Sequence, residues 1–329
     1  GINMQLDFAE IGGYFEFSLS NSAQFPYPNA FKYHSARSAF YDLIRKSKIK
    51  KIWMPRFICD SMLEPLRLLN IDVLFYNLHT NFFPILPEKL NKDEYLFYVN
   101  YFGICGSVQK ELLNLYPSQQ VIFDHAQAFF VEPLNCFATL YSPRKFLPVA
   151  EGGLLITEQN FMPTYDSRNV DEMVQQYQHS LIRRLTSASL AYDKFKKNEN
   201  KFNDCLPKRL SGITEEILNS LNYESFKEKR LENFRFLHNK LGRFNQLKIN
   251  LDQLESPLTY PFLLNEEISS CLINAKVYTP TYWSDSLSRV GINSFEYKLI
   301  SQASHLICDQ RYSKEEMQHQ VDIIQDYLK

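Results

Sequence analysis

Lys145 is the residue of this sequence whose type and setting could most directly carry out chemistry. It lies in the segment SPRKFLPVAEGG (residues 142–153), next to Arg144 and among apolar residues, and a Glu151-Gly152-Gly153 turn follows it. Lysines usually lie on the surface, and an apolar-flanked lysine often only extends its ammonium group to solvent. Burial, or a neighbouring cation such as Arg144, would lower the pKa of the amine, which could then act as a nucleophile and form a Schiff base with an aldehyde.

The aldehyde that proteins most often hold through a lysine is pyridoxal phosphate (PLP), and this cofactor makes further demands. Its ring nitrogen needs a carboxylate, which Asp124 could supply at the end of the apolar run VIFD. Gln127 could reach the hydroxyl edge of the ring, and Ala126 is small enough to lie against the ring. An aspartate at the end of a strand is also a common turn or cap residue, so Asp124 alone decides little.

The phosphate of PLP needs backbone N–H groups, hydroxyls or a cation, preferably at a helix N-terminus. The segment YHSARSAFYDLI begins a predicted helix with Ser35, Arg37 and Ser38 in its first turn, and Ser142 shortly precedes Lys145. The free N–H groups of that turn, together with Arg37, would form a phosphate cradle. The segment SARSAF taken alone is an ordinary helix start, but in combination these residues indicate one PLP site.

The elements that must position these residues are strands ending at one edge of a sheet. Apolar runs alternate with stretches of helical spacing, which indicates an α/β fold with a mainly parallel mixed sheet flanked by helices. Ligands bind such sheets at the carboxyl ends of the strands. Residues 101–103, 124–127 and 142–145 all follow predicted strands, so we expect them to converge. The predicted strands are KKIWMPRF, IDVLFYNL, YLFYVNYFG, QQVIFDHA, CFATLYSP and GGLLITE.

The second half of the chain is mainly helical in pattern. One long helical stretch is predicted over residues 170–197, and the segment NENKFNDCLPKRLSG interrupts it as a candidate boundary or mobile loop. A second helical region is predicted to begin at Thr214 as its cap and to end at Gly242.

A smaller C-terminal unit is predicted from two further strands and a final helix. The strands are SPLTYPFLL and AKVYTPTYW, and the helix begins at Ser313, with Glu316 completing a capping box. We therefore predict a large PLP-binding domain over residues 1–205 and a smaller α+β domain over residues 206–329.

Composition favours an ordinary globular protein and excludes several classes of partner. The 329 residues carry a formal net charge of −1, with 45% hydrophobic and 22% charged residues. No basic stripe suggests a nucleic-acid partner, and no apolar run approaches the length of a membrane span. The six cysteines show no metal-binding or disulfide spacing, and the first residues lack the pattern of an export signal. We expect free thiols, no metal site and a cytoplasmic protein.

The combination and order of these motifs resemble the DegT–DnrJ–StrS family of PLP-dependent sugar aminotransferases. The family carries a lysine followed at fixed spacing by Glu-Gly-Gly, here KFLPVAEGG, and an Asp-x-x-Gln element, here DHAQ. The segments YFG, IGGYFEF, SARSAF, KRLENFRFL and DQRYSKEEM are similar to its further markers, so the resemblance covers nearly the whole chain.

The resemblance implies the aspartate-aminotransferase (type I) fold and roles for single residues. Lys145 would be the Schiff-base lysine, Asp124 the partner of the ring nitrogen and Gln127 a contact of the ring oxygen. The family's phosphate-binding Gly-Thr-Ala would correspond to Ala36, Arg37 and Ser38. Members of the family are homodimers, so a homodimer is expected.

Some positions depart from the family pattern. Cys59 stands where an aromatic residue often stacks on the ring, which leaves Tyr101 or Phe102 for that contact. Leu140 stands where a phosphate-binding serine is common, so Ser142 is expected to take over the phosphate.

The resemblance implies an aminotransferase that moves an amino group from glutamate to a nucleotide-linked keto-sugar in bacterial polysaccharide or amino-sugar synthesis. Lys145 would act as the general acid and base. One alternative is a sugar dehydratase, which carries histidine in place of this lysine, and another is a PLP enzyme acting on a different ketone. A third is a related protein that has lost catalysis and serves as a binding or regulatory subunit. A NAD-binding fold is disfavoured because no GxGxxG follows an early strand.

Overall fold

A seven-stranded sheet is the main element of the structure, a computed structural model that describes residues 10–329. The strand order is β1-β7-β6-β5-β4-β2-β3. The pairings β3–β2, β2–β4, β4–β5 and β5–β6 are parallel, whereas β7 is antiparallel to both β1 and β6. The strands are β1 (Phe31–Tyr33), β2 (Lys51–Pro55), β3 (Asp72–Tyr76), β4 (Glu94–Val99), β5 (Val121–His125), β6 (Ala138–Tyr141) and β7 (Gly153–Ile156).

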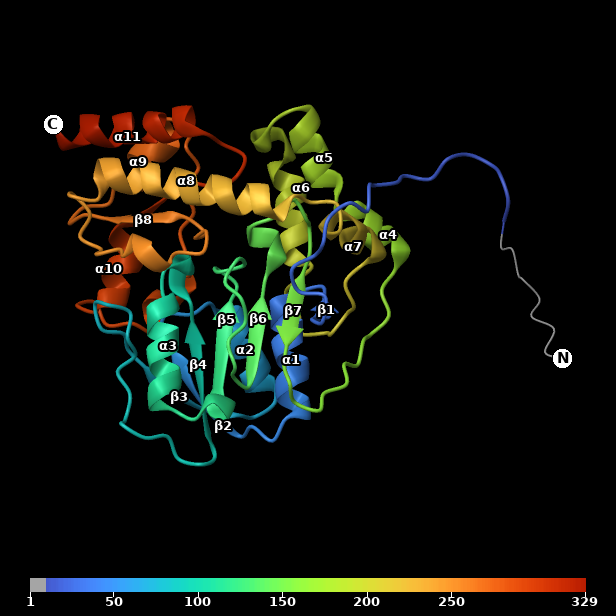
Figure 1. Cartoon of the computed structure of the whole chain (residues 1–329), viewed down its shortest axis with the longest axis horizontal. Coiled ribbons are helices and arrows are strands. Elements are labelled where there is room, and N and C mark those ends of the chain that lie inside the picture. The colour runs from blue at the N-terminus through green and yellow to red at the C-terminus, as the bar shows by residue number, and fades with distance from the viewer. Residues whose placement is uncertain (1–9) are drawn as a thin grey trace.

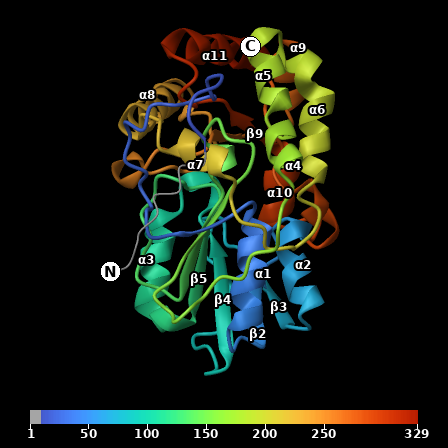
Figure 2. The same cartoon turned by 90° about the vertical axis from the view of Figure 1, so that its right-hand side faces the viewer.

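Helices cover both faces of this sheet, which confirms the predicted α/β class. Helix α3 (Gly106–Leu115) lies on one face, and α1 (Ala36–Lys46) and α2 (Asp60–Leu68) lie on the other (Figure 2). Because both faces are covered, the central strands are apolar without alternation, and every residue of β5 is buried.

Helix α1 forms where the sequence predicted a helix start. Ser35 is its N-cap, and the Ser35 Oγ accepts a hydrogen bond from the backbone N of Ser38 at 3.1 Å. Phe40, Leu43 and Ile44 occur at helical spacing and are buried against the sheet. The helix therefore points its N-terminus toward the edge of the sheet at which the parallel strands end.

The predicted helix over residues 170–197 is wrong as one continuous element. The chain forms α4 (Val170–Gln175), α5 (Gln178–Leu185) and α6 (Ala188–Asn200), and α5 packs against α6 as a helical pair (Figure 2). The break after α5 is local, because Ser187 caps α6 by accepting a hydrogen bond from the backbone N of Leu190.

Two further predictions in the second half need correction. The helical region predicted to begin at Thr214 is split into α7 (Gly212–Leu218) and α8 (Tyr223–Leu241), and Ser211 rather than Thr214 is the cap of α7. Segment 275–283, predicted as a strand, forms no strand.

The C-terminal unit is a two-stranded antiparallel sheet, β8 (Tyr260–Leu263) with β9 (Ala303–Leu306), packed against helices. Helices α8 and α11 lie side by side across the end of the molecule at the carboxyl ends of the parallel strands (Figure 1). The predicted capping box of Ser313 and Glu316 at the start of α11 is confirmed. The remaining helices are α9 (Ser269–Asn274), α10 (Phe295–Gln302) and α11 (Lys314–Leu328).

Two of the three core clusters lie mainly on one sheet each, although the larger one also includes Leu263 of β8 and Ala303 of β9. The larger core packs the seven-stranded sheet, and a separate core packs α8, β8, β9 and α11. The boundary between residues 205 and 206 stays a prediction. No helix of the described part of the chain is long and apolar enough to cross a membrane.

Candidate active site

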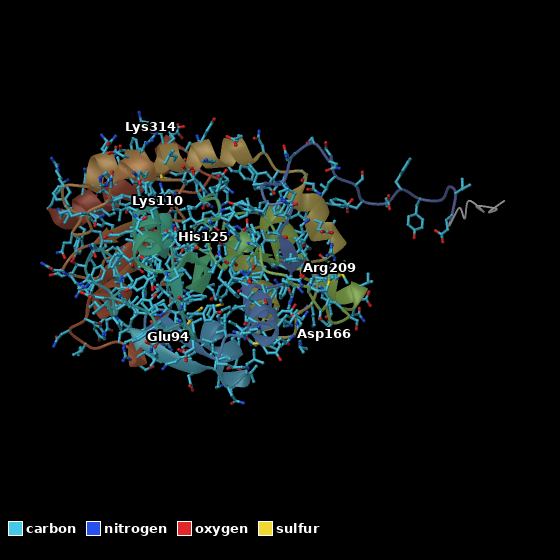
Figure 3. The ribbon with its side chains drawn as sticks, turned by 60° about the horizontal axis from the view of Figure 1, so that its bottom comes forward. Glu94, Lys110, His125, Asp166, Arg209 and Lys314 are labelled. Carbon is cyan, nitrogen blue, oxygen red and sulfur yellow. The ribbon has the colours of Figure 1, made fainter. Side chains whose placement is uncertain are left out.

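A cavity of about 290 Å³ lies at the carboxyl ends of the parallel strands. It receives residues from the end of β5, the turn after β6, the starts of α1 and α2 and the end of α6. Seven of the predicted site residues line it together: Lys145, Asp124, Ala126, Ala36, Arg37, Ser142 and Cys59. The described residues also form a larger surface groove of about 420 Å³ beside α8 and Lys314. Lys314 lies at the outer edge of the molecule (Figure 3). That groove contains none of the predicted site residues.

Lys145 is half-buried in a short helical turn, Pro143–Lys145, that follows β6 directly. The backbone N of Phe146 donates to the Pro143 carbonyl at 3.0 Å and so holds the turn closed. Burial lowers the pKa of the Lys145 amine, while the negative charge of Asp124 opposes that shift. The lysine is therefore not a snorkelling surface residue: its amine faces the cavity and loses its proton more readily than an exposed lysine does.

Asp124 lies in β5 with 2% of its surface exposed, between Val99 of β4 and Leu140 of β6 in the sheet register. Its Oδ1 accepts a hydrogen bond from the backbone N of Ala126 at 2.8 Å, and its Oδ2 has no hydrogen-bond partner among the described residues. Burial raises the pKa of Asp124, whereas the hydrogen bond from Ala126 and the charge of Lys145 lower it. A buried carboxylate with one free oxygen is suited to a ligand that carries an N–H group or a positive charge.

The start of α1 forms the other end of the cavity. Ala36, Arg37 and Ser142 line it, so first-turn N–H groups, a guanidinium and a hydroxyl lie around one space that can hold an anion. Ser38 does not line it, because the Ser38 hydroxyl donates to the carbonyl of Leu206 at 2.8 Å.

The two glycines after Glu151 explain how α1 reaches the cavity. A Cβ atom on Gly153 would overlap the backbone of Ser35 and Ala36, so β7 can approach the start of α1 this closely only with glycine at that position. Gly152 has φ +142, and its backbone N donates to the carbonyl of His34 at 2.8 Å. The Gly-Gly pair therefore places the helix start beside the lysine turn.

Glu151 stabilises the Gly152-Gly153 turn and lies outside the cavity. Its buried carboxylate accepts a hydrogen bond from the backbone N of Ser211 at 2.6 Å and forms an ion pair with Arg168. Burial raises the pKa of Glu151, but Arg168 and Ser211 lower it more, so the net shift is downward.

Two other predicted site residues, Gln127 and Tyr101, are buried outside the cavity lining. The Oε1 of Gln127 accepts from the backbone N of Phe102 at 2.8 Å, and its Nε2 is buried without a partner among the described residues. Tyr101 stacks on Phe57 with ring centroids 5.2 Å apart and donates to the Phe57 carbonyl at 2.9 Å. His125, the residue after Asp124, is buried near the middle of the molecule (Figure 3). The predicted roles of Gln127 and Tyr101 toward a ring stay predictions.

Sequence reasoning missed the residues that reach the cavity from distant parts of the chain. Trp283 lines it, and the Lys145 Nζ lies 5.9 Å from the centroid of the Trp283 ring. Trp283 has φ +57 in a segment that was predicted as a strand, so no periodic pattern could have placed it. The end of α6 and the loop after it contribute Glu199, Asn200, Phe202 and Asn203.

Comparison with known proteins shows which solved structures share this fold. No protein-family model and no curated protein matches the sequence. Among solved structures, a DegT DnrJ EryC1 StrS aminotransferase from Brucella abortus matches with a TM-score of 0.62 at 13% identity, over 91% of this chain and 85% of that chain. The sugar aminotransferase CalS13 from Micromonospora echinospora matches with a TM-score of 0.61 at 12% identity, over 91% and 87%.

A third similar structure is a GDP-4-keto-6-deoxymannose-3-dehydratase with a trapped PLP–glutamate geminal diamine. It matches with a TM-score of 0.60 at 14% identity, over 89% of this chain and 87% of that chain. These likenesses cover 89% to 91% of this chain. The chain therefore has the fold of the DegT–DnrJ–EryC1–StrS sugar aminotransferases.

Proposed function

We propose that this protein is a PLP-dependent aminotransferase that transfers an amino group from an amino acid, with glutamate as the expected donor, to a keto-sugar. The observation that carries this proposal is the meeting of Lys145, Asp124 and the start of α1 in one cavity. An amine with a lowered pKa, a buried carboxylate with a free oxygen and an anion cradle are the three groups that PLP requires. The fold adds support, because it is the fold of sugar aminotransferases.

The described residues can hold PLP in the roles that the sequence predicted for them. Asp124 would hold the ring nitrogen through Oδ2, Lys145 would bind the aldehyde carbon, and the phosphate would lie against Ala36, Arg37 and Ser142. When bound, PLP supplies a ring that withdraws electrons from the substrate carbon next to the amino group.

Each side chain then has a definite task. With PLP bound, Asp124 would keep a proton on the ring nitrogen, because the low local dielectric strengthens the attraction between its carboxylate and a cationic ring. Once the donor's amine has replaced Lys145 on the aldehyde carbon, the freed Lys145 Nζ would take the proton from the donor Cα and pass it to that same cofactor carbon, a task suited to an amine whose pKa burial has lowered. Trp283 lines the cavity, and its large apolar ring would limit the access of water to the reacting atoms.

The proposal is tested by the absorbance spectrum of the purified protein with PLP, before and after addition of glutamate. We expect a visible band that glutamate removes, and borohydride reduction followed by peptide mass spectrometry should place the cofactor on Lys145. The Lys145→Ala variant should lack both the band and the labelled peptide. A band that is identical in this variant would refute the role of Lys145, and failure of the wild-type protein to bind PLP would favour the non-catalytic alternative.

The dehydratase alternative has a specific observation behind it, since one similar structure is a dehydratase. The lysine at position 145 argues against it, because family dehydratases carry histidine there. Product analysis with a keto-sugar nucleotide separates the two reactions: an amino-sugar supports the aminotransferase, whereas loss of a hydroxyl group supports the dehydratase.

The same proposal includes a homodimer in the cytoplasm. Residues 11–17 run outward from the body (Figure 1), and Tyr14 and Phe15 are almost fully exposed, as is expected of a segment that packs on a second copy. All six cysteines are free, which suits a reducing compartment. Light scattering after size-exclusion chromatography should give twice the mass of the chain, and deletion of residues 1–17 should weaken the dimer.

A further inference from the structure

Arg144 is a cation of the cavity that has no task in the proposed reaction so far. It precedes Lys145 on the same short turn and lines the same cavity. Its guanidinium carbon lies 4.2 Å from the centroid of the Phe202 ring, and its Nη1 lies 2.7 Å from the Oε1 of Glu199. Stacking on an aromatic ring holds the guanidinium plane in one orientation.

Glu199 is an unusual partner because of its place in α6. It lies in the last turn of that helix, where a carboxylate faces the negative end of the helix dipole. In the described structure the only hydrogen bond of its carboxylate is the one from Arg144, and 38% of its side chain remains exposed. Arg144 is better covered, with 23% of its side chain exposed. The Glu199 carboxylate can therefore leave this ion pair at a lower free-energy cost than the Arg144 guanidinium can.

The guanidinium retains unused hydrogen-bonding capacity. Of its N–H donors, only Nη1 has a partner among the described residues, although a guanidinium can bind a carboxylate through two parallel hydrogen bonds. Both charges also act on the neighbouring amine, because Arg144 lowers the pKa of Lys145 and Glu199 raises it. An anion bound at Arg144 would thus lie within electrostatic reach of Lys145.

We propose that Arg144 binds a carboxylate group of the amino-acid donor, and that Glu199 occupies this position until the donor displaces it. The inference rests on the proposed function. It assigns a carboxylate rather than the phosphate of the cofactor, because the start of α1 with Ser142 and Arg37 already forms a phosphate cradle. The displaced group, a glutamate side chain, carries the same head group as the incoming ligand.

The test measures binding of succinate, a dicarboxylate that has no amino group to transfer, to the PLP-loaded protein by titration calorimetry. The variants are Arg144→Gln and Glu199→Gln, and the affinity for PLP is measured separately for each by absorbance. A matched control is Glu255→Gln, which removes the carboxylate of an ion pair with Lys227, of 2.8 Å and also partly exposed, outside the cavity lining.

We expect Arg144→Gln to weaken succinate binding by about tenfold or more, because a charge-assisted, two-point contact is lost. Glu199→Gln should tighten it by about threefold to tenfold, because the internal competitor is removed. Arg144→Lys, which keeps the charge but loses the planar fork, should lie between wild type and Arg144→Gln. In the Arg144 and Glu199 variants the change in succinate affinity should exceed any change in PLP affinity, because both residues act on the Lys145 amine, and the control should change neither affinity.

Three results would overturn the inference while leaving the proposed function intact: unchanged succinate affinity in a PLP-loaded Arg144→Gln protein, a loss of PLP rather than succinate affinity in that variant, or weaker succinate binding in Glu199→Gln. A wild-type protein that binds no PLP would overturn the proposed function and this inference together.

Discussion

Asp124 and Lys145 show how burial prepares two side chains for opposite tasks. Burial raises the pKa of the carboxyl group and lowers that of the amine, because it disfavours the charged form of each. Each group also stabilises the charge of the other, so a proton can move in the cavity at a smaller cost than in an apolar core. Both residues could be named from the sequence, because Asp124 directly follows the apolar run VIF and Lys145 stands beside Arg144 in an otherwise apolar stretch that leads to Glu-Gly-Gly.

Replacing Asp124 by Asn tests the negative charge of the side chain separately from its shape. The variant keeps an oxygen that can accept from Ala126 but loses the negative charge, so we expect the glutamate half-reaction to slow by about 100-fold or more. Rapid mixing with glutamate, followed by absorbance, measures the rate. Asp93→Asn, at an exposed position, is the control. An unchanged rate with bound PLP would remove Asp124 from the catalytic groups.

At the scale of elements, the Gly-Gly pair connects β7 to the start of α1. The spacing from Lys145 to these glycines was visible in the sequence, but its physical reason was not. The reason is the contact of Gly153 with the backbone of Ser35 and Ala36, which joins residues far apart in the chain.

Gly153→Ala should therefore displace the start of α1. We expect a loss of about 1–3 kcal/mol in the free energy of unfolding, together with weaker PLP binding, because the added methyl group overlaps backbone that cannot turn aside. Urea unfolding and PLP titration measure the two effects. Gly212→Ala, in the first turn of α7, is the matched control, since a Cβ atom there meets nothing within 4 Å. Equal behaviour of the two variants would contradict this account.

The elements that sequence reasoning misplaced have a common cause. The pattern of residues 170–197 is helical throughout, but Ser187 caps a new helix in its interior. Such a cap depends on a local hydrogen bond, which the spacing of apolar residues does not reveal. Trp283 reaches the cavity from a segment of irregular backbone, where neither a period of two nor of 3.6 residues applies. Gln127 accepts from the backbone of Phe102, a partner that only the folded chain brings near, and its predicted contact with the ring stays a prediction.

At the scale of the whole molecule, Arg230 joins the small sheet to the lysine turn. It is 2% exposed and forms no ion pair among the described residues. Its Nη2 donates to the carbonyl of Phe146 at 3.3 Å and its Nη1 to that of Leu258 at 3.2 Å, while Gln310 also donates to the Phe146 carbonyl at 2.7 Å. Phe146 directly follows Lys145, so helix α8 and the loop before α11 support the turn that carries the amine.

Arg230→Met should destabilise the fold by about 3 kcal/mol, because buried carbonyls lose their donors. It should also change the absorbance band of bound PLP, since the turn at Lys145 loses part of its support. Thermal unfolding and the spectrum are the two measurements. Arg235→Met, on the exposed face of the same helix, should alter neither. A destabilised variant with an unaltered band would limit Arg230 to a role in stability.

Acid should unfold the protein partly through buried histidines. Burial lowers the pKa of His305 from 6.5 to about 3, so the folded chain holds it neutral while the unfolded chain binds a proton. Its stabilising contribution is therefore complete above pH 6.5 and falls on acidification, by about 2 kcal/mol at pH 5. In His305→Gln, urea unfolding between pH 7 and pH 5 should show a smaller loss of stability. His319→Gln, at an exposed position, should follow wild type.

The hydrogen bonds around Phe146 also have a consequence for synthesis of the chain. The strand before Lys145 is complete early in translation, but the donors to the next carbonyl come from residues 230 and 310. The ribosome must therefore release the chain as far as residue 310 before this turn acquires its final support. A nascent chain holds the lysine long before it holds the geometry of the turn, so we expect binding of the proposed cofactor to be a late event in the maturation of the protein.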